Sequence, residues 1–329
     1  MSIEHISGNR IYNASVSVVI TCFNDSPVFT RCLESVLNQT VKPQEIIVVD
    51  DCSNDSEKIE EIINSYNDNT IIYIRNEVNK NGAFSRNRGM SISTSDYIAL
   101  LDGDDYWKKN HIEQNLIFLQ SKKIDFTYSD VIEIRANGEE KIRKVTDIAT
   151  LENKNDILFY SPPQTNSFFF KKTVYDFVKF DESLRRHQDF QFLITAINTQ
   201  NIELAYNNIA TSYYCESHRP SAARVDYDSI FRFWDIHSEK FTKLLLNHFL
   251  KQQLHSCIVI KKGEGIIDYQ KKYGVLNNND LQNSLYLKLI NLIGCTKTIS
   301  RMVLYFYYHL VYGKLSFNKK FASKLTNQI

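Results

Sequence analysis

The chain has 329 residues, 43% of them hydrophobic, which is enough to bury the core of two domains or of one large domain with an appendage, so disorder is not the default expectation. The formal net charge of +1 provides no general attraction to nucleic acid, and no nucleic-acid partner is expected. Six cysteines are scattered without a CxxC pair, which argues against a zinc ribbon or a disulfide scaffold and favours reduced thiols in a cytoplasm.

The two ends of the chain lack the patterns of export and membrane insertion. The N-terminus does not show the basic and then apolar order of a signal peptide. The longest apolar run, MVLYFYY near residue 305, is too short to span a bilayer. We therefore expect a cytoplasmic protein that is soluble or peripherally attached to a membrane.

The first hundred residues alternate between short apolar runs and amphipathic segments. The apolar runs predict buried strands of a parallel sheet, at residues 16–20, 45–50, 71–74 and 97–102. The segments between them predict helices, at residues 26–40, 56–66 and 82–92. Ser26 is the predicted N-cap of the first helix, with Pro27 at its first position. This order predicts a doubly wound α/β half, in which ligands bind beyond the carboxyl ends of the strands.

The pattern changes after a predicted helix at residues 111–121. Residues 126–134 and 167–172 predict strands of a mixed, partly antiparallel sheet, and residues 189–197 predict a buried helix. Beyond about Asp226 the apolar spacing is helical almost to the end of the chain. The second half therefore predicts a different sheet followed by a helical region.

Three acids follow the fourth predicted strand directly in the stretch YIALLDGDDYW. Asp102, Asp104 and Asp105 repel one another unless a positive group lies among them, and although an acid can simply cap a helix, a cap needs only one. Two carboxylates with Gly103 between them, where glycine lets the backbone turn sharply, suit Mg²⁺ or Mn²⁺ and leave positions open for phosphate oxygens. These ligands do not distinguish the two metals.

Other sites that bind nucleotides or carry out hydrolysis are absent from the sequence. There is no GxGxxG after a strand and no GxxxxGK[ST], so neither a dinucleotide fingerprint nor a P-loop is present. There is also no GxSxG elbow and no HExxH zinc motif. Hydride transfer and P-loop hydrolysis are therefore disfavoured.

Five stretches carry a resemblance to a known family: VSVVITCFND, EIIVVDDCSND, NGAFSRNRG, YIALLDGDDYW and RRHQDFQFL. Together they resemble the family 2 glycosyltransferases, inverting enzymes with the GT-A fold, over roughly residues 15–220. The resemblance implies a Rossmann-like nucleotide-binding half at 15–125 and a mixed-sheet acceptor half at 126–225. An N-terminal extension at 1–14 and an α-helical C-terminal region at 226–329 complete the expected organisation.

The resemblance implies a pocket for the nucleotide-sugar donor, with Thr21, Phe23 and Asp51 around the nucleotide. Phe23 stands where the family often has tyrosine, so the apolar contact is kept and the hydroxyl is lost. Arg86 and Arg88 would face the nucleotide or diphosphate. Without the resemblance, Phe23 is a core residue, Asp51 belongs to a turn or helix cap, and the arginines lie on a solvated helix face. We expect one of the two arginines in the site.

The resemblance also implies the metal ligands and their neighbours. Asp102 would contact ribose or metal and Asp104 would bind the metal directly, while the role of Asp105 is left open. His218 would complete the metal or phosphate shell, and Arg219 would hold the diphosphate. A lone histidine in a polar loop is otherwise simply solvated.

Asp189 matches the base of the family. Inversion requires a group that removes the proton of the acceptor hydroxyl as this attacks from the face opposite the leaving diphosphate. Taken alone, an acid at the start of an apolar helix is an N-cap. His187 would position the acceptor or pack against the protein.

The sequence thus predicts a metal-dependent inverting glycosyltransferase that moves a sugar from a nucleotide donor, most simply a UDP-sugar, to a hydroxyl of a surface glycan such as an O-antigen, capsule or lipopolysaccharide. One alternative is an inactive module that binds the nucleotide-sugar. The other is a nucleotidyltransferase, which would need a basic glycine-rich loop where the chain has TCFNDSP.

The last segment, from residue 281 onward, has no acidic residue and mixes lysines with aromatic residues. This composition is typical of a helix at an anionic membrane surface, where a lipid-linked glycan acceptor would be held. A helical cap packed on the catalytic domain, or a homodimer formed through the exposed aromatic residues, is the alternative.

Overall fold

The computed structural model describes residues 14–216, 225–260 and 266–277. The chain divides into two units, Met1–Arg219 and Pro220–Ile329. The predicted C-terminal membrane segment, His218 and Arg219 lie outside the described residues.

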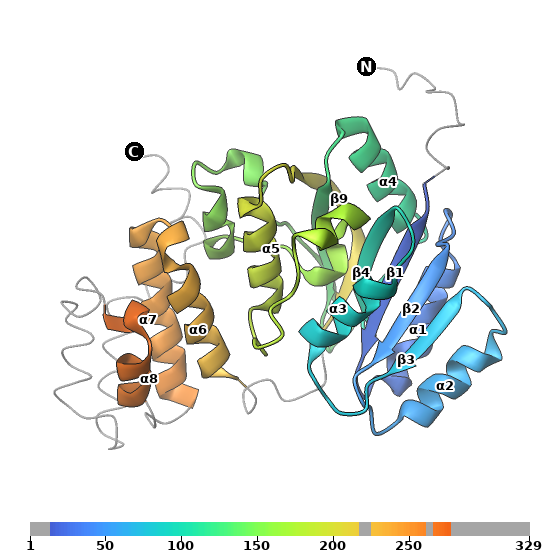
Figure 1. Ribbon diagram of the computed structural model, residues 1–329, viewed down its shortest axis with the longest axis horizontal. Helices are drawn as coiled ribbons and strands as arrows, with labels where there is room; N and C mark the ends of the chain where they lie inside the picture. The colour runs from blue at the N-terminus through green and yellow to red at the C-terminus, as the bar shows by residue number, and fades with distance from the viewer. Residues whose placement is uncertain (1–13, 217–224, 261–265, 278–329) are drawn as a thin grey trace. The chain divides into compact units, whose positions relative to one another are not determined.

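Four parallel strands form the first part of the sheet, in the spatial order β3-β2-β1-β4 (Figure 1). They are β1 (Val16–Cys22), β2 (Glu45–Asp50), β3 (Ile71–Arg75) and β4 (Tyr97–Asp102). All residues of β1 and β2 are buried, as expected for central strands covered on both faces. The predicted parallel half is confirmed, with β1 two residues longer than predicted.

Helices cover both faces of these strands: α1 (Ser26–Leu37), α2 (Ser56–Ser65), α3 (Gly82–Ile92) and α4 (His111–Lys122). The apolar sides of α1, α2 and α4 share one core with alternate residues of β1, β2 and β4. On the other face, α3 approaches β1 so closely at Gly89 that a Cβ atom there would collide with Val19. The predicted N-cap of α1 is off by one residue, because Asp25 takes that position and Ser26 begins the helix.

The second part of the sheet is mixed. Its elements are β5 (Tyr106–Trp107), β6 (Phe126–Ile134), β7 (Glu140–Arg143), β8 (Phe169–Lys171), α5 (Gln188–Asn198) and β9 (Leu204–Cys215). Among the described residues, nine strands form one sheet in the order β3-β2-β1-β4-β8-β6-β9-β5, with β7 paired to β6. β8 runs antiparallel to β4 and β6, whereas β9 runs parallel to β6. This mixed arrangement confirms the predicted change of sheet.

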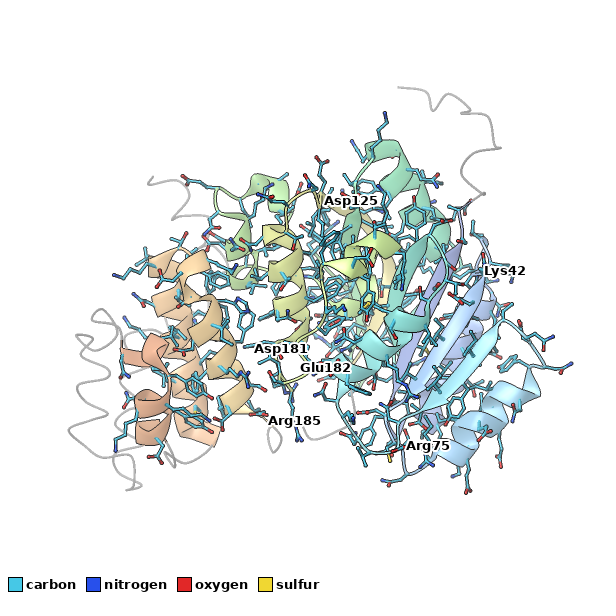
Figure 2. All side chains as sticks on the ribbon, viewed as in Figure 1. Lys42, Arg75, Asp125, Asp181, Glu182 and Arg185 are labelled. Carbon is cyan, nitrogen blue, oxygen red and sulfur yellow. The ribbon has the colours of Figure 1, made fainter. Side chains whose placement is uncertain are left out.

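Aromatic packing fixes α5 on this part of the sheet. Phe192 of α5 contacts the rings of Phe126, Phe170 and Phe180, with the closest centroids 4.3 Å apart. The segment before α5 is also tied to α3, because the side-chain amide of Asn81 donates a hydrogen bond of 2.8 Å to the carbonyl of Glu182, labelled in Figure 2. The N-terminus of α5 is therefore held beside α3.

Strand β9, which ends with Tyr213, Tyr214 and Cys215, was not predicted, and one predicted strand of this half is wrong in its bounds. The predicted strand at 167–172 is limited to β8, because short 3₁₀ helices flank it on both sides. The 3₁₀ helices of the described residues are Ile148–Thr150, Lys154–Phe159, Thr165–Ser167, Lys172–Asp176, Ser238–Lys240 and Gly274–Asn277.

The second unit is helical in its described residues, as predicted. It contains α6 (Tyr227–His237), α7 (Lys243–Ile260) and α8 (Ile266–Lys272). Phe231 and Trp234 of α6 are fully buried in its core. Within the part of the chain that the structure describes, no helix combines the length and apolar character needed to cross a bilayer.

Candidate functional site

The carboxyl ends of β1 and β4 bring two predicted site residues together. Thr21 and Asp102 are register partners in the parallel ladder, and the Thr21 hydroxyl donates to Oδ1 of Asp102 over 3.1 Å. Nη2 of Arg86 donates to the same oxygen over 2.6 Å. Asp102 is 31% exposed, so its carboxylate has a protein-bound side and a side open to a ligand.

Arg86 connects this acid to the start of α5. Its Nη1 donates a hydrogen bond of 3.0 Å to Oε1 of Gln188, and its guanidinium lies 5.4 Å from the centre of the Phe180 ring. A guanidinium is planar and permanently charged, so two such bonds fix the distance between the groups that it joins. Arg86 therefore links Asp102 to the residue that directly precedes Asp189.

Asp189 lies in the first turn of α5, two residues after the N-cap, which is His187 in a left-handed conformation with φ of 62°. Burial raises the pKa of the Asp189 carboxyl, and the Asp102 charge raises it further, although the Phe190 N–H and Arg86 oppose this. A raised pKa gives a carboxylate more affinity for a proton, which a general base needs. Because His187 is the N-cap, Asp189 does not cap the helix, and a catalytic role remains open to its carboxylate.

His187 packs beside this acid. Its ring stacks on Phe190 with centroids 4.6 Å apart, and burial lowers its pKa to about 3. The imidazole is therefore neutral near neutral pH and adds no positive charge beside Asp189. Packing is the role that the contacts of His187 support.

The acids that follow β4 differ from one another. Asp105 is buried, and its carboxylate accepts hydrogen bonds of 2.8 Å from the Asn166 amide and from the backbone N–H of Cys215, so it holds the end of β9. Burial raises the pKa of Asp105 well above its usual range, and the charges of Asp104 and Asp102 add to this rise. The three acids therefore repel one another, as expected from the sequence.

Gly103 is required here for a reason that differs from the predicted one. Its φ is not in the left-handed region. A Cβ atom at this position would instead lie 2.8 Å from Cβ of Cys22 and 3.1 Å from Oδ2 of Asp25. Glycine therefore lets the turn after β4, with Asp102 and Asp104 on either side of it, approach the end of β1.

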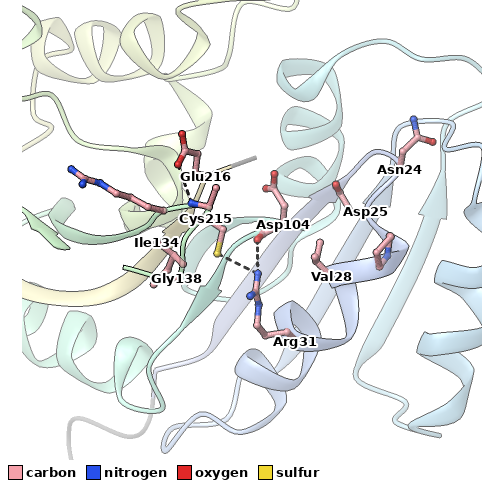
Figure 3. Close-up of a pocket in the computed structure, with 12 residues that line it drawn as sticks. Asn24, Asp25, Val28, Arg31, Asp104, Ile134, Gly138, Cys215 and Glu216 are labelled. Atoms are coloured by element: carbon pink, nitrogen blue, oxygen red, sulfur yellow. Dashed lines mark hydrogen bonds between the residues drawn. The ribbon is translucent and has the colours of Figure 1, made fainter. Parts of the chain in front are cut away.

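Asp104 lines a pocket of about 400 Å³ on the side of this turn that faces α1 (Figure 3). The opposite wall comes from the β6–β7 turn and from the end of β9. Arg31 is fixed in this pocket, because it donates to the Asp104 carbonyl over 3.1 Å and to Sγ of Cys215 over 3.2 Å and lies over the Tyr106 ring. The backbone of Asp104 is thereby held in place beside open space.

Asp51 and Arg88 bond to the loop between β3 and α3. The carboxylate of Asp51 accepts hydrogen bonds of 2.8 to 2.9 Å from the side chain of Asn76 and from the backbone N–H groups of Lys80 and Asn81. Nη1 of Arg88 donates to Oδ1 of the same Asn76 over 2.6 Å. Of the two predicted arginines, Arg86 is the one that contacts the acids after β4.

Phe23 is half-buried just after β1, where its backbone N–H donates to Oδ2 of Asp25 over 2.8 Å. Asp25 is itself buried and faces Gly103. Asp25 and Gln188 had no predicted role, although both belong to the stretches that carry the family resemblance. Their contacts with Gly103 and Arg86 arise from tertiary packing, which the sequence does not report.

The charged groups of the site suit a cation only in part. Among the described residues, no three or more histidine, cysteine, aspartate or glutamate side chains surround a common point. The mutual repulsion of Asp102, Asp104 and Asp105 fits a positive ligand, and two carboxylates can hold Mg²⁺ when phosphate oxygens and water complete its shell. The donor set therefore fits a divalent cation that binds together with a diphosphate.

Comparison with known proteins identifies the family of this site. The sequence model of glycosyl transferase family 2 matches residues 17–186. The amylovoran biosynthesis glycosyltransferase AmsB of Erwinia amylovora is 33% identical over 191 residues, 55% of this chain and 64% of that protein. The glucosyltransferase WfaP of Escherichia coli, which is named for UDP-glucose and GlcNAc-diphosphoundecaprenol, is 39% identical over 115 residues, 35% of this chain and 45% of its own length.

Solved structures support the same fold. Staphylococcus aureus TarS 1–349 in complex with UDP-GlcNAc aligns with 87% of this chain and 82% of its own, with a TM-score of 0.57 and 17% sequence identity. At this identity the likeness bears on the fold alone. The family match, the mixed sheet and the order of the acidic motifs along the chain all indicate the same family. The chain belongs to glycosyl transferase family 2 and has the GT-A fold.

Proposed function

We propose that the protein transfers a sugar from a UDP-sugar, with inversion, to a hydroxyl of a bacterial surface glycan while the glycan is lipid-linked at the cytoplasmic face of the membrane. The observation that carries the proposal is the bridge made by Arg86, which bonds to Asp102 over 2.6 Å and to Gln188 over 3.0 Å. This bridge fixes the separation between Asp102, the proposed donor-side acid, and Gln188, the residue before the half-buried Asp189. A direct displacement requires such a fixed separation.

Thr21, Phe23 and Asp102 would form the donor side. Asp102 offers the side of its carboxylate that Thr21 and Arg86 leave open, which suits a ribose hydroxyl. The half-buried Phe23 offers an apolar surface to the base. Asp51 would act through the loop that it holds at residues 76–81, because its carboxylate is 4% exposed and already accepts three hydrogen bonds.

Asp189 would act as the general base toward the acceptor hydroxyl. Its raised pKa favours proton uptake, and the neighbouring charge of Arg86 opposes this rise and so favours the ionised form that accepts the proton. As the hydroxyl attacks, its oxygen forms the new glycosidic bond, its proton passes to Asp189 and the bond to the nucleoside diphosphate breaks. Arg86 would also face the departing charge, with Arg88 supporting the neighbouring loop.

Asp104, with Asp102, would hold a divalent metal ion, Mn²⁺ or Mg²⁺, which when bound neutralises charge on the diphosphate. His218 and Arg219 are proposed to complete the phosphate side. The relatives named for amylovoran and for a diphosphoundecaprenol-linked acceptor support a membrane-bound glycan as the acceptor class.

Donor turnover tests this proposal. Release of nucleoside diphosphate from a panel of UDP-, GDP- and dTDP-sugars is measured with Mn²⁺, Mg²⁺ or EDTA, for the wild type and for Asp104→Asn. Glu60→Gln, which neutralises an exposed acid of α2, is the matched control. We expect one UDP-sugar to be hydrolysed slowly with metal, and Asp104→Asn to lower that rate about a hundredfold. Equal rates in EDTA and metal would refute the metal dependence, and turnover of only another nucleotide-sugar would refute the donor.

A further inference from the structure

Arg143 ends strand β7 on the acceptor half of the sheet. The β6–β7 ladder pairs it with Val131, and its Nε lies 3.2 Å from Oε1 of Glu133 two residues along β6. The Arg143 side chain is 26% exposed and that of Glu133 is 33% exposed. The guanidinium is therefore partly withdrawn from solvent at the edge of the sheet.

The hydrogen-bonding capacity of this guanidinium is largely unused. Within the described part of the chain, Nε and Nη2 are shielded from solvent and neither has a hydrogen-bond partner, since the contact of Nε with Glu133 lacks hydrogen-bond geometry. Burial lowers the pKa of Arg143, but a guanidinium does not lose its proton in a protein, so the donors stay charged. A buried charged donor without a partner is costly, which points to a ligand.

The sheet places Arg143 near the end of β9, because Glu133, which contacts Arg143, is the register partner of Tyr214 in the β6–β9 ladder. The charges of Glu133, Tyr214 and Asp189 all act on it and raise its pKa against the effect of burial. Burial raises the pKa of the Tyr214 hydroxyl, and the charges of Asp105, Asp104 and Asp102 raise it further. The proposed base is therefore within electrostatic reach of two arginines, Arg86 on the donor side and Arg143 on the acceptor side.

We infer that Arg143 binds a phosphate group of the acceptor and so holds the attacking hydroxyl near Asp189. The inference rests on the proposed function and adds to it a residue that recognises the acceptor. The planar fork of a guanidinium matches two oxygens of one phosphate, whereas a neutral sugar would satisfy only single donors. Glu133 lies beside Nε, which leaves the edge formed by Nη2 and by Nη1, the nitrogen that is not among the shielded atoms, for the incoming anion.

The source of the phosphate is the diphosphate of a lipid-linked acceptor. In such a molecule the first sugar separates the diphosphate from the hydroxyl that attacks, so the two groups reach neighbouring but distinct residues. Arg86 already bonds to Asp102 and Gln188 and serves the donor, while Arg143 comes from β7 and is joined to neither. The geometry thus assigns one arginine to each diphosphate.

Binding of decyl diphosphate tests this inference without knowledge of the acceptor sugar. Calorimetry is performed on the full chain saturated with UDP, so that the donor site is blocked, and is repeated without UDP. The variants are Arg143→Gln, Arg143→Lys and, as a matched control, Arg232→Gln at an exposed arginine of α6. We expect Arg143→Gln to weaken binding about 10- to 100-fold, which corresponds to one lost charge-assisted bond. Lysine should restore part of the affinity, and the control should match the wild type.

Three results would overturn the inference. They are equal affinity of the wild type and Arg143→Gln, no binding of decyl diphosphate by the wild type, and inorganic pyrophosphate binding as tightly as decyl diphosphate. The double variant Glu133→Gln/Arg143→Gln, which leaves no uncompensated charge, guards against misfolding and should show the same loss. UDP affinity is measured separately. If the protein fails to bind UDP, the proposed donor is refuted, and the titrations of decyl diphosphate without UDP still test the role of Arg143.

Discussion

At the carboxyl end of β2, the acids are satisfied by the protein itself. Asp50 accepts hydrogen bonds from the Ser53 N–H over 2.8 Å and from the Tyr73 hydroxyl over 2.9 Å, and Asp51 accepts three more. At the end of β4, Asp102 is bound on one oxygen only, and burial, together with the charges of Asp104 and Asp102, raises the pKa of Asp105. The two ends look alike in the sequence, as DDCSND and DGDD.

The difference shows how a structural acid can be told from an acid that serves a ligand. The carboxylates after β2 stabilise the loop at 76–81 and the start of α3, because Asn81 both donates to Asp51 and caps that helix. Asp102 instead keeps an open side, and the pKa of the half-buried Asp189 is raised by burial. Acids that the fold leaves unsatisfied cost stability, and we therefore expect these two to serve a ligand. Substitutions should therefore separate the two groups.

The largest effect is expected at Asp189. We expect Asp189→Asn to lower the rate of sugar transfer by about 10² to 10⁴, because an amide cannot accept the hydroxyl proton. Affinity for the donor should not change. Transfer kinetics with donor and acceptor, together with calorimetric binding of UDP, measure the two quantities. If Asp189→Asn and the Glu60→Gln control transfer sugar at the same rate, Asp189 is a structural acid.

A smaller effect, on stability, is expected at Asp51. Asp51→Asn replaces one acceptor oxygen by an NH₂ group that would face the N–H of Lys80 or Asn81. We expect this to lower the free energy of unfolding by about 1 to 3 kcal/mol. Asp102→Asn, at a partly exposed ion pair, should change it by less than about 1 kcal/mol. Urea unfolding of both variants measures the difference, and the reverse order would contradict the assignment of the two strand ends.

The sequence predicted the parallel half well because its strands are continuous β-branched runs with helices between them. It did not predict β9, because a β-bulge between Asn207 and Ala210 interrupts the alternation of buried and exposed residues there. β5 has only two residues, Tyr106 and Trp107, too few for any pattern to emerge. Strands that depend on distant partners, as β5 depends on β9, leave little local signal.

The candidate site was predictable where its chemistry is local in the chain. The DGDD stretch places its acids within four residues, so their repulsion could be inferred from the sequence. The roles of Asp51 and Gln188 could not, because their partners, Asn81 and Arg86, lie 30 and 102 residues away. Arg143 gave no signal either, since its unused donors follow from its position at the end of β7.

The smallest effect is expected in the pH dependence. Because the pKa of Asp189 is raised, transfer should rise with pH through a value above the usual range of a carboxyl, about 4. Arg86 lowers this pKa, so Arg86→Gln should move the acid limb of the remaining activity to higher pH.

The raised pKa of Asp189 also makes stability depend on pH. The folded state binds the proton of Asp189 more tightly than the unfolded state does, so the free energy of unfolding falls as pH rises through the folded pKa. Asp189→Asn should lack this fall and be at least as stable as the wild type at neutral pH. Unfolding measured between about pH 4 and pH 8 tests this, and a variant that is less stable only at high pH would show that ionised Asp189 stabilises the helix start.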